Sequence, residues 1–209
     1  RLSFAFAFPD TYEVGMSHLG LQILYAILNG MPGVVAERCF APWPDMESRM
    51  RQAGIALASL ESHTPLDRFD LIGFSLQYEL SYTNVLNMLD LARIPLRREA
   101  RREEDPLIIA GGPCAFNPLP MSLFIDAFVI GEGEEIITEI VSVVLNGKTR
   151  GYSRKRILEE LACIDGLYVP AIHKKDASIR KRIVTDLNRW QLPVCPVVRG
   201  VADLPAQVH

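Results

Sequence analysis

Glycines and polar side chains follow four apolar runs of this 209-residue sequence, at positions where they could bind a ligand. These candidate residues are Asp10, Glu13, Ser75, Gln77, Glu79, Tyr82, Gly111, Gly112, Pro113, Cys114, Gly131, Glu132, Gly133 and Glu134. Glycine has no Cβ, so a flat ligand can approach the main chain closely. Carboxylates accept hydrogen bonds from hydroxyl and amide groups but repel phosphates. The pattern therefore favours a ligand rich in hydrogen-bond donors over a nucleoside triphosphate.

Each candidate also has a simpler interpretation. A pair such as Gly111–Gly112 occurs in ordinary strand-to-loop turns. Glu134 and Glu135 would complement the dipole of a helix that begins at the second glycine turn. The polar side chains between residues 75 and 79 would share one side only if the preceding strand continues that far. Both interpretations remain open at the level of the sequence.

Several kinds of chemistry have no motif in this sequence. It contains no Gly-x-Ser-x-Gly, no Walker loop, no Gly-x-Gly-x-x-Gly after the first apolar run and no His-Glu-x-x-His. The four cysteines (Cys39, Cys114, Cys163 and Cys195) lack metal-ligand spacing, which favours reduced thiols in a cytoplasmic protein. The net charge of −3 creates no global attraction for nucleic acid. No apolar run is long enough for a membrane span, so we expect no membrane partner.

Alternating strands and helices must position the candidate residues. Strands are predicted over residues 2–8, 33–42, 70–81, 106–113 and 126–135, and helices over 21–28, 43–54, 82–94 and 134–147, the last ending at Gly147. This alternation predicts an α/β fold with a flavodoxin-like, doubly wound parallel sheet in the order 2-1-3-4-5. In such a sheet the ligand crevice lies beyond the carboxyl ends of the strands, where all four candidate segments would meet.

The composition changes after Gly147. We expect a domain over residues 1–147 and an appendage over residues 148–209, which would consist of a short helix, a β-hairpin and a linker. The predicted helix covers residues 153–166, and the predicted hairpin, with a basic turn, covers residues 167–187 and should pack outside the sheet. Prolines after residue 188 predict an extended linker.

The stretch "IAGGPCAFNPLPMSLFIDAFVIGEGEEII" (residues 109–137) resembles the cobalamin-binding-type domain at the N-terminus of B12-binding radical S-adenosylmethionine (radical SAM) proteins. That domain carries a "GGP" turn, a proline-containing helix, an aspartate before the last strand and "GEGE". The stretches "FPDTYEVGMSHLGLQILYAILN" (residues 8–29) and "LIGFSLQYELSYTN" (residues 71–84) resemble an uncharacterised subgroup of the same family. The resemblance implies cobalamin as the ligand of the candidate residues.

The resemblance also implies a larger parent protein. A C-terminal radical SAM domain would hold a 4Fe-4S cluster, cleave S-adenosylmethionine and start radical chemistry, such as methyl or methylthio transfer to RNA or protein. The Cys-x-x-x-Cys-x-x-Cys that holds the cluster is absent here. In relatives it follows a segment like "VADLPAQVH", so we interpret the chain as a fragment that is not catalytic alone and carries no cluster.

One departure concerns the lower ligand of cobalt. Many cobalamin domains carry Asp-x-His-x-x-Gly after the first strand, and that histidine binds cobalt. Here "PDTYEVG" has Tyr12 in its place, and His18 does not fit the spacing. The resemblance therefore implies cobalamin without a histidine ligand. Two rival hypotheses are a degenerate structural or substrate-docking domain that binds no cobalamin, and a stand-alone enzyme, which the missing nucleophile motifs disfavour.

Overall fold

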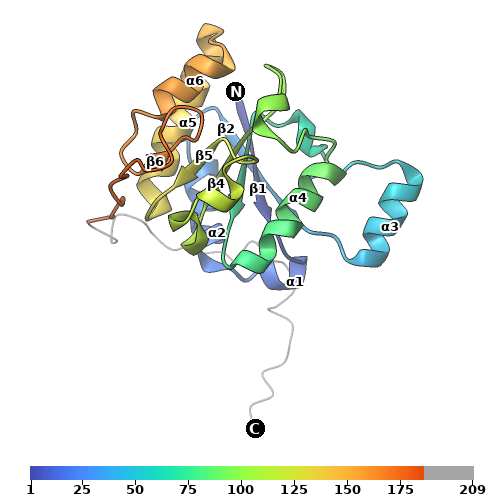
Figure 1. The fold of residues 1–209 in the computed structure, drawn as a ribbon. Coiled ribbons are helices and arrows are strands. Elements are labelled where there is room, and N and C mark those ends of the chain that lie inside the picture. The colour runs from blue at the N-terminus through green and yellow to red at the C-terminus, as the bar shows by residue number, and fades with distance from the viewer. Residues whose placement is uncertain (186–209) are drawn as a thin grey trace.

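The computed structural model describes residues 1–185, which form a six-stranded sheet in the order β2-β1-β3-β4-β5-β6 (Figure 1). The strands are β1 (Leu2–Phe8), β2 (Val34–Phe40), β3 (Leu71–Ser75), β4 (Leu107–Gly111), β5 (Ala127–Val129) and β6 (Leu167–Tyr168). The helices are α1 (Tyr12–Gly15), α2 (Leu19–Asn29), α3 (Pro44–Ala53), α4 (Tyr82–Leu91), α5 (Gly133–Arg150) and α6 (Arg154–Leu161). The first five strands are parallel, so the predicted flavodoxin-like order is confirmed.

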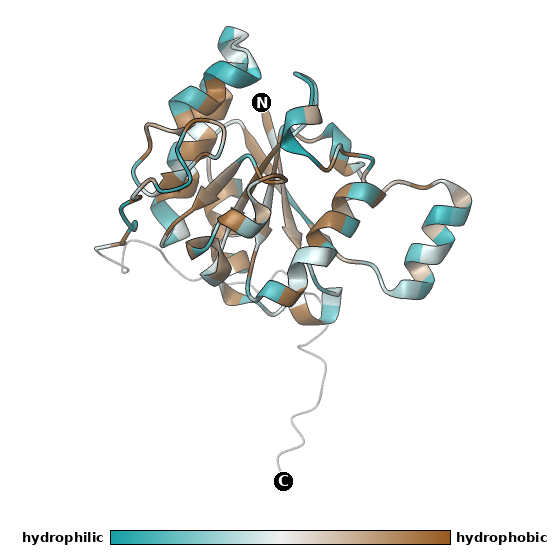
Figure 2. Ribbon diagram, viewed as in Figure 1, coloured by the Kyte–Doolittle hydropathy of each residue, from teal (hydrophilic) through white to brown (hydrophobic). Residues whose placement is uncertain are grey.

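Two apolar clusters cover the two faces of the sheet. In β1, Phe4 and Phe6 face the cluster shared with α2, α5 and α6, whereas Ala5 and Ala7 face the cluster that contains α4. Hydropathy follows this arrangement, with the apolar strands inside and polar helix surfaces outside (Figure 2). The alternation along the first strand therefore produces a sheet that is buried on both sides.

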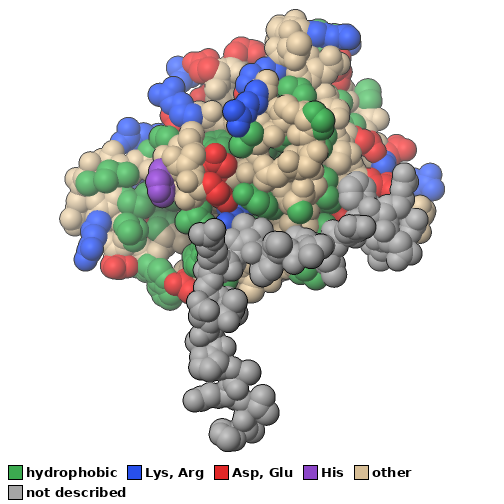
Figure 3. All heavy atoms as spheres, turned by 180° about the vertical axis from the view of Figure 1, so that it is seen from behind, with side chains coloured by type: hydrophobic (Ala, Val, Ile, Leu, Met, Phe, Trp, Pro, Cys, Tyr) green, Lys and Arg blue, Asp and Glu red, His purple; other side chains and the backbone are tan. Residues whose placement is uncertain are grey.

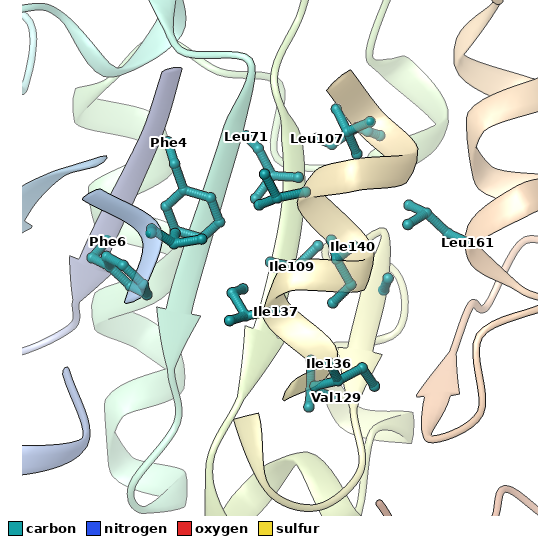
Figure 4. Packing of buried hydrophobic residues seen from close by; sticks show 14 of the residues in the cluster. Phe4, Phe6, Leu71, Leu107, Ile109, Val129, Ile136, Ile137, Ile140 and Leu161 are labelled. Carbon is teal, nitrogen blue, oxygen red and sulfur yellow. The ribbon is translucent and has the colours of Figure 1, made fainter. Parts of the chain in front are cut away.

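Helix α5 packs its apolar side chains directly onto the strands. Ile136, Ile137 and Ile140 point from this helix toward Ile109 and Val129 on the neighbouring strands (Figure 4). Their i, i+1 and i+4 spacing forms one face of the helix, which is the pattern expected for a helix covering a sheet. This packing fixes the amino end of α5 at the carboxyl end of the sheet.

The end of α5 differs from the prediction. The helix continues to Arg150 and ends at Gly151, whose φ of 67° is left-handed. Gly147 is not a stop, because a Cβ there would lie 2.7 Å from Cγ1 of Ile157 in α6. This glycine lets two helices pack closely, a role that local sequence signals do not distinguish from a helix end. The domain boundary near Lys148 stays a prediction, and α5 runs through it.

The prediction of a β-hairpin is wrong, because no hairpin forms within the described residues. The segment after α6 instead forms β6, which pairs antiparallel with β5 and places Tyr168 opposite Phe128. Pairing satisfies the backbone groups of an edge that would otherwise be open. The predicted helix before it is confirmed as α6, while residues 186–187 and the expected linker lie outside the described residues. No helix within residues 1–185 is long and apolar enough to cross a membrane.

Candidate functional site

A cavity of about 210 Å³ lies where β1, β3, β4 and β5 end, between the sheet and helices α2 and α5. Its apolar lining includes Phe4, Phe6, Leu24, Ile109, Val129 and Ile137. Figure 4 shows most of these side chains packed between the strands and α5. The cavity therefore has an apolar floor at the edge of a parallel sheet, which is where ligands bind in this class of fold.

More than half of the predicted site residues line this cavity. They are Ser75, Gln77, Gly111, Gly112, Gly131, Glu132, Gly133 and Glu134. The remaining six, Asp10, Glu13, Glu79, Tyr82, Pro113 and Cys114, do not line it. The structure thus brings parts of three of the four predicted segments together at the cavity and leaves the first segment outside its lining.

The first segment has a structural role in the described chain. Asp10 accepts hydrogen bonds from the backbone N–H of Thr11 at 2.7 Å and from the hydroxyl of Tyr78 at 3.1 Å. The bond to Asp10 raises the pKa of Tyr78. Glu13 accepts a hydrogen bond from Nε1 of Trp43 at 3.3 Å. Both carboxylates therefore connect loops at the carboxyl end of the sheet.

The second segment turns away from the sheet earlier than predicted. Strand β3 ends at Ser75, and Glu79 begins a short 3₁₀ helix (Glu79–Ser81). Gln77 still lies beside Ser75, but Glu79 no longer shares their side. Tyr82 and Cys114 lie near Glu79 and outside the cavity, and partial burial raises the pKa of the Cys114 thiol, with the charge of Glu79 as a smaller cause.

Ser75 and Gln77 form one polar part of the rim. Nε2 of Gln77 donates to Oγ of Ser75 at 2.6 Å, so the two side chains are held together. As that bond uses Oγ of Ser75 as an acceptor, its hydroxyl hydrogen can be donated to a ligand.

The glycines at the cavity differ in how much space a side chain would have at each position. A Cβ at Gly112 (φ 98°) would lie 2.8 Å from the carbonyl oxygen of Leu76, so the close packing of two loops requires this glycine. A Cβ at Gly111 would meet only Cβ of Val129, at 3.6 Å, and one at Gly133 would meet the side chain of Leu24 at 3.3 Å. Gly111 therefore leaves room for a side chain that faces the cavity, whereas a side chain at Gly133 would require Leu24 to move.

Two carboxylates of the second glycine turn, Glu132 and Glu135, have partners, as does Glu139 further along α5. The backbone N–H of Val184 donates to Oε2 of Glu132. The guanidinium of Arg182 pairs with Glu135 at 3.2 Å and also with Glu139. Oε2 of Glu134, in contrast, is buried and has no hydrogen-bond partner among the described residues.

The sequence interpretation missed His18 as a residue of the cavity lining. Nδ1 of His18 accepts a hydrogen bond from the backbone N–H of Leu21 at 3.1 Å and so caps α2. This bond places the ring hydrogen of a neutral imidazole on Nε2, which then cannot bind a metal. Histidine is not a preferred cap, so no local signal identified this role.

A second cavity of about 260 Å³ lies at the opposite end of the sheet, beside the starts of β3 and β4. Half of its lining residues are charged, and Nζ of Lys148 pairs with Oδ1 of Asp70 at 2.6 Å. Within residues 1–185 no three His, Cys, Asp or Glu side chains form a group that could hold a metal ion. The charged groups of this cavity are explained by contacts within the fold.

Comparisons with known proteins place the chain among longer relatives. Uncharacterized protein MJ0966 of Methanocaldococcus jannaschii is 24% identical over 141 residues, which are 66% of this chain and 26% of that protein. The chain thus spans about a quarter of the length of this relative. The structure of the radical S-adenosylmethionine methyltransferase TsrM from Kitasatospora setae, with tryptophan substrate and a SAM analogue bound, matches with a TM-score of 0.48 and 14% identity. That match covers 80% of this chain and 28% of TsrM.

A family model gives the more specific result. The model described as "Radical SAM proteins, N-terminal" matches residues 20–170, a range that contains α2 to β6 and every segment around the cavity except β1 and its loop. Because this match covers more than half of the chain, the protein belongs to the family of N-terminal domains of radical SAM proteins.

Proposed function

We propose that this chain is a cobalamin-binding module and that the cavity beyond β3, β4 and β5 receives part of the cofactor. The observation that carries the proposal is the position and lining of the cavity, which combines an apolar floor, an open glycine (Gly111) and a rim of hydrogen-bonding side chains. Membership of the family of N-terminal domains of radical SAM proteins supports a role for this module beside a radical SAM domain.

The size of the cavity indicates which part of cobalamin would enter. About 210 Å³ is less than the roughly 300–1,000 Å³ of pockets that enclose whole drug-sized ligands. Only a compact group can therefore be enclosed, and the benzimidazole base of cobalamin is planar and mostly apolar. The corrin ring would lie outside, across the rim near Gly111 and Gly133.

The polar groups of the rim suit this ligand. Corrin carries many amide side chains, whose N–H groups can donate to a carboxylate such as Glu134. The carboxylates of the rim disfavour a nucleoside triphosphate, because they would repel its phosphates at close range. Bound cobalamin would supply cobalt as a carrier of a methyl group.

We further propose that cobalt has no histidine ligand from this chain. Tyr12 stands where related domains carry the ligating histidine. His18 uses Nδ1 to cap α2, so its Nε2 carries the ring hydrogen. Binding through Nε2 would require the loss of this cap. The remaining chemistry, with S-adenosylmethionine, a 4Fe-4S cluster and an RNA or protein substrate, belongs to the proposed C-terminal radical SAM domain.

A comparison of two corrinoids tests the proposal. Cobalamin and cobinamide, which lacks the nucleotide base, would be titrated into the full-length protein by calorimetry. We expect cobalamin to bind at least about tenfold more tightly, because burial of the base removes apolar surface from water. Equal affinities would show that the cavity does not receive the base.

The alternative function is a docking domain that binds no cobalamin. It is favoured by large apolar side chains exposed on loops at the same end of the sheet, with Leu80 83%, Trp43 56% and Phe116 53% exposed. Hydrophobic side chains also reach the surface on the face shown in Figure 3. Exposed apolar groups that gather in one region mark contact surfaces. Failure of the full-length protein to bind either corrinoid would support this alternative.

A further inference from the structure

The acidic residues at the start of α5 differ in whether their carboxylate oxygens have hydrogen-bond or ion-pair partners. Glu132 accepts from the backbone of Val184, and Glu135 pairs with Arg182. Glu134 lies between them in the sequence and lines the cavity, yet its Oε2 is buried without a hydrogen-bond partner among the described residues. One carboxylate of the turn is therefore left with an open acceptor.

An open acceptor of this kind is costly to a folded protein. A buried carboxylate oxygen has lost its hydrogen bonds to water, and most such atoms in proteins find a replacement donor. The guanidinium of Arg182 lies at this turn, but it is engaged by Glu135 and Glu139. Its backbone is held beside Gly131, where the N–H of Arg182 donates to the carbonyl of Ile130 at 2.8 Å. The chain itself thus supplies no donor to Glu134 from this segment.

We propose that Glu134 accepts a hydrogen bond from a hydroxyl or N–H group on the part of the ligand that enters the cavity, and that it selects ligands carrying such a donor. This inference rests on the proposed function and assigns one specificity-determining residue to it. Glu134 is available for this role, whereas Glu132, Glu135 and Glu139 are already bound to Arg182 or Val184.

Variants of two neighbouring residues separate this role from a structural one. Glu134→Met removes the acceptor, Glu134→Gln keeps an acceptor oxygen, and Glu135→Gln is the matched control that removes the same charge from the same helix turn. Each would be made in the full-length protein. Affinity for hydroxocobalamin and the melting temperature of the ligand-free protein would be measured for all three.

We expect two effects of opposite sign for Glu134→Met. Affinity should fall about tenfold, since a charge-assisted hydrogen bond is lost. The melting temperature of the ligand-free protein should rise, because the buried unpaired oxygen is gone and its cost exceeds the lost interaction with the helix dipole. Glu134→Gln should lose less affinity, and Glu135→Gln should bind as the wild type does while melting at a lower temperature.

The outcomes distinguish this inference from the proposed function. If the wild type binds cobalamin and Glu134→Met binds equally well, Glu134 makes no contact and only this inference fails. A lower melting temperature for Glu134→Met overturns it whether or not cobalamin binds, because the residue is then structural. If the wild type binds no cobalamin but Glu134→Met melts at a higher temperature, the proposed function fails and Glu134 is kept for a different donor-bearing ligand.

Discussion

The backbone of Arg182 occupies the space that a side chain at Gly131 would need. A Cβ built on Gly131 would overlap the carbonyl oxygen of Arg182 and lie 2.7 Å from its nitrogen. The φ of Gly131 is 125°, a conformation that other residues rarely adopt. The first glycine of "GEGE" is therefore required by a segment of the chain, residues 182–184, that runs beside the turn, and not by the approach of a ligand.

This relationship predicts a large cost for Gly131→Ala. Gly151→Ala is the control, because Gly151 also has a positive φ (67°) but has no atom near its Cβ position within 4 Å. A strained backbone angle alone costs about 1–3 kcal/mol. We expect Gly131→Ala to reduce the free energy of unfolding by at least about 1 kcal/mol more than the control, measured by urea unfolding. Equal losses would mean that the contact with Arg182 is not formed.

Substitution by valine should change the free energy of unfolding differently at two adjacent glycines. Gly112→Val places a Cβ 2.8 Å from the backbone oxygen of Leu76 and strains a φ of 98°, so it should destabilise the protein by about 2 kcal/mol or more. Gly111→Val projects into the cavity from the end of β4 and should change the free energy of unfolding by less than about 1 kcal/mol. Thermal and urea unfolding of both variants test this. Similar losses at the two positions would contradict the geometry.

Asp126 should be among the most sensitive positions for stability. Its Oδ2 accepts from the backbone of Ile108 at 2.8 Å, from Arg101 at 2.9 Å and from Arg154 at 2.7 Å. Asp126→Ala leaves the fully buried guanidinium of Arg101 without its carboxylate, at a cost of about 3–5 kcal/mol. Asp165→Ala, at an exposed residue, should stay within about 0.5 kcal/mol. Urea unfolding of the two variants is the measurement, and a small loss for Asp126→Ala would refute the buried ion pair.

The thiols should differ in reactivity at pH 8. Burial raises the pKa of Cys39 to about 12, so at pH 8 this group is a protonated thiol, which is not nucleophilic. Cys163 is exposed. Iodoacetamide followed by peptide mapping should therefore label Cys163 in the folded protein and label Cys39 only after unfolding. Equal labelling of both in the folded state would show that Cys39 is not buried.

The order of the first five strands could be predicted because four of the five strands, all except β4, are followed by a helix of recognisable periodicity. Such alternation permits few connections other than parallel crossovers. The meeting of Ser75, Gly111 and Glu134 at one cavity follows from the same rule, since parallel strands end at one edge. These parts of the site depend on local patterns and on one rule of topology.

Other features depend on contacts between distant residues. β6 has only two residues, too few for a periodic signal, and forms because β5 offers an edge. Gly131 and Gly147 look like turn and stop signals, but their need for glycine comes from Arg182 and Ile157, which are 51 and 10 residues further along the chain. Partners so placed cannot be identified from local sequence.

The most direct test of the central proposal is the titration of hydroxocobalamin into the full-length wild type and its Gly111→Val variant, followed by visible spectroscopy. The account predicts saturable binding to the wild type with a spectrum that lacks histidine coordination. It also predicts that the variant, although stably folded, binds at least about tenfold more weakly, because the valine fills part of the cavity. No binding to the wild type, a histidine-coordinated spectrum, or equal affinity of the folded variant would contradict it.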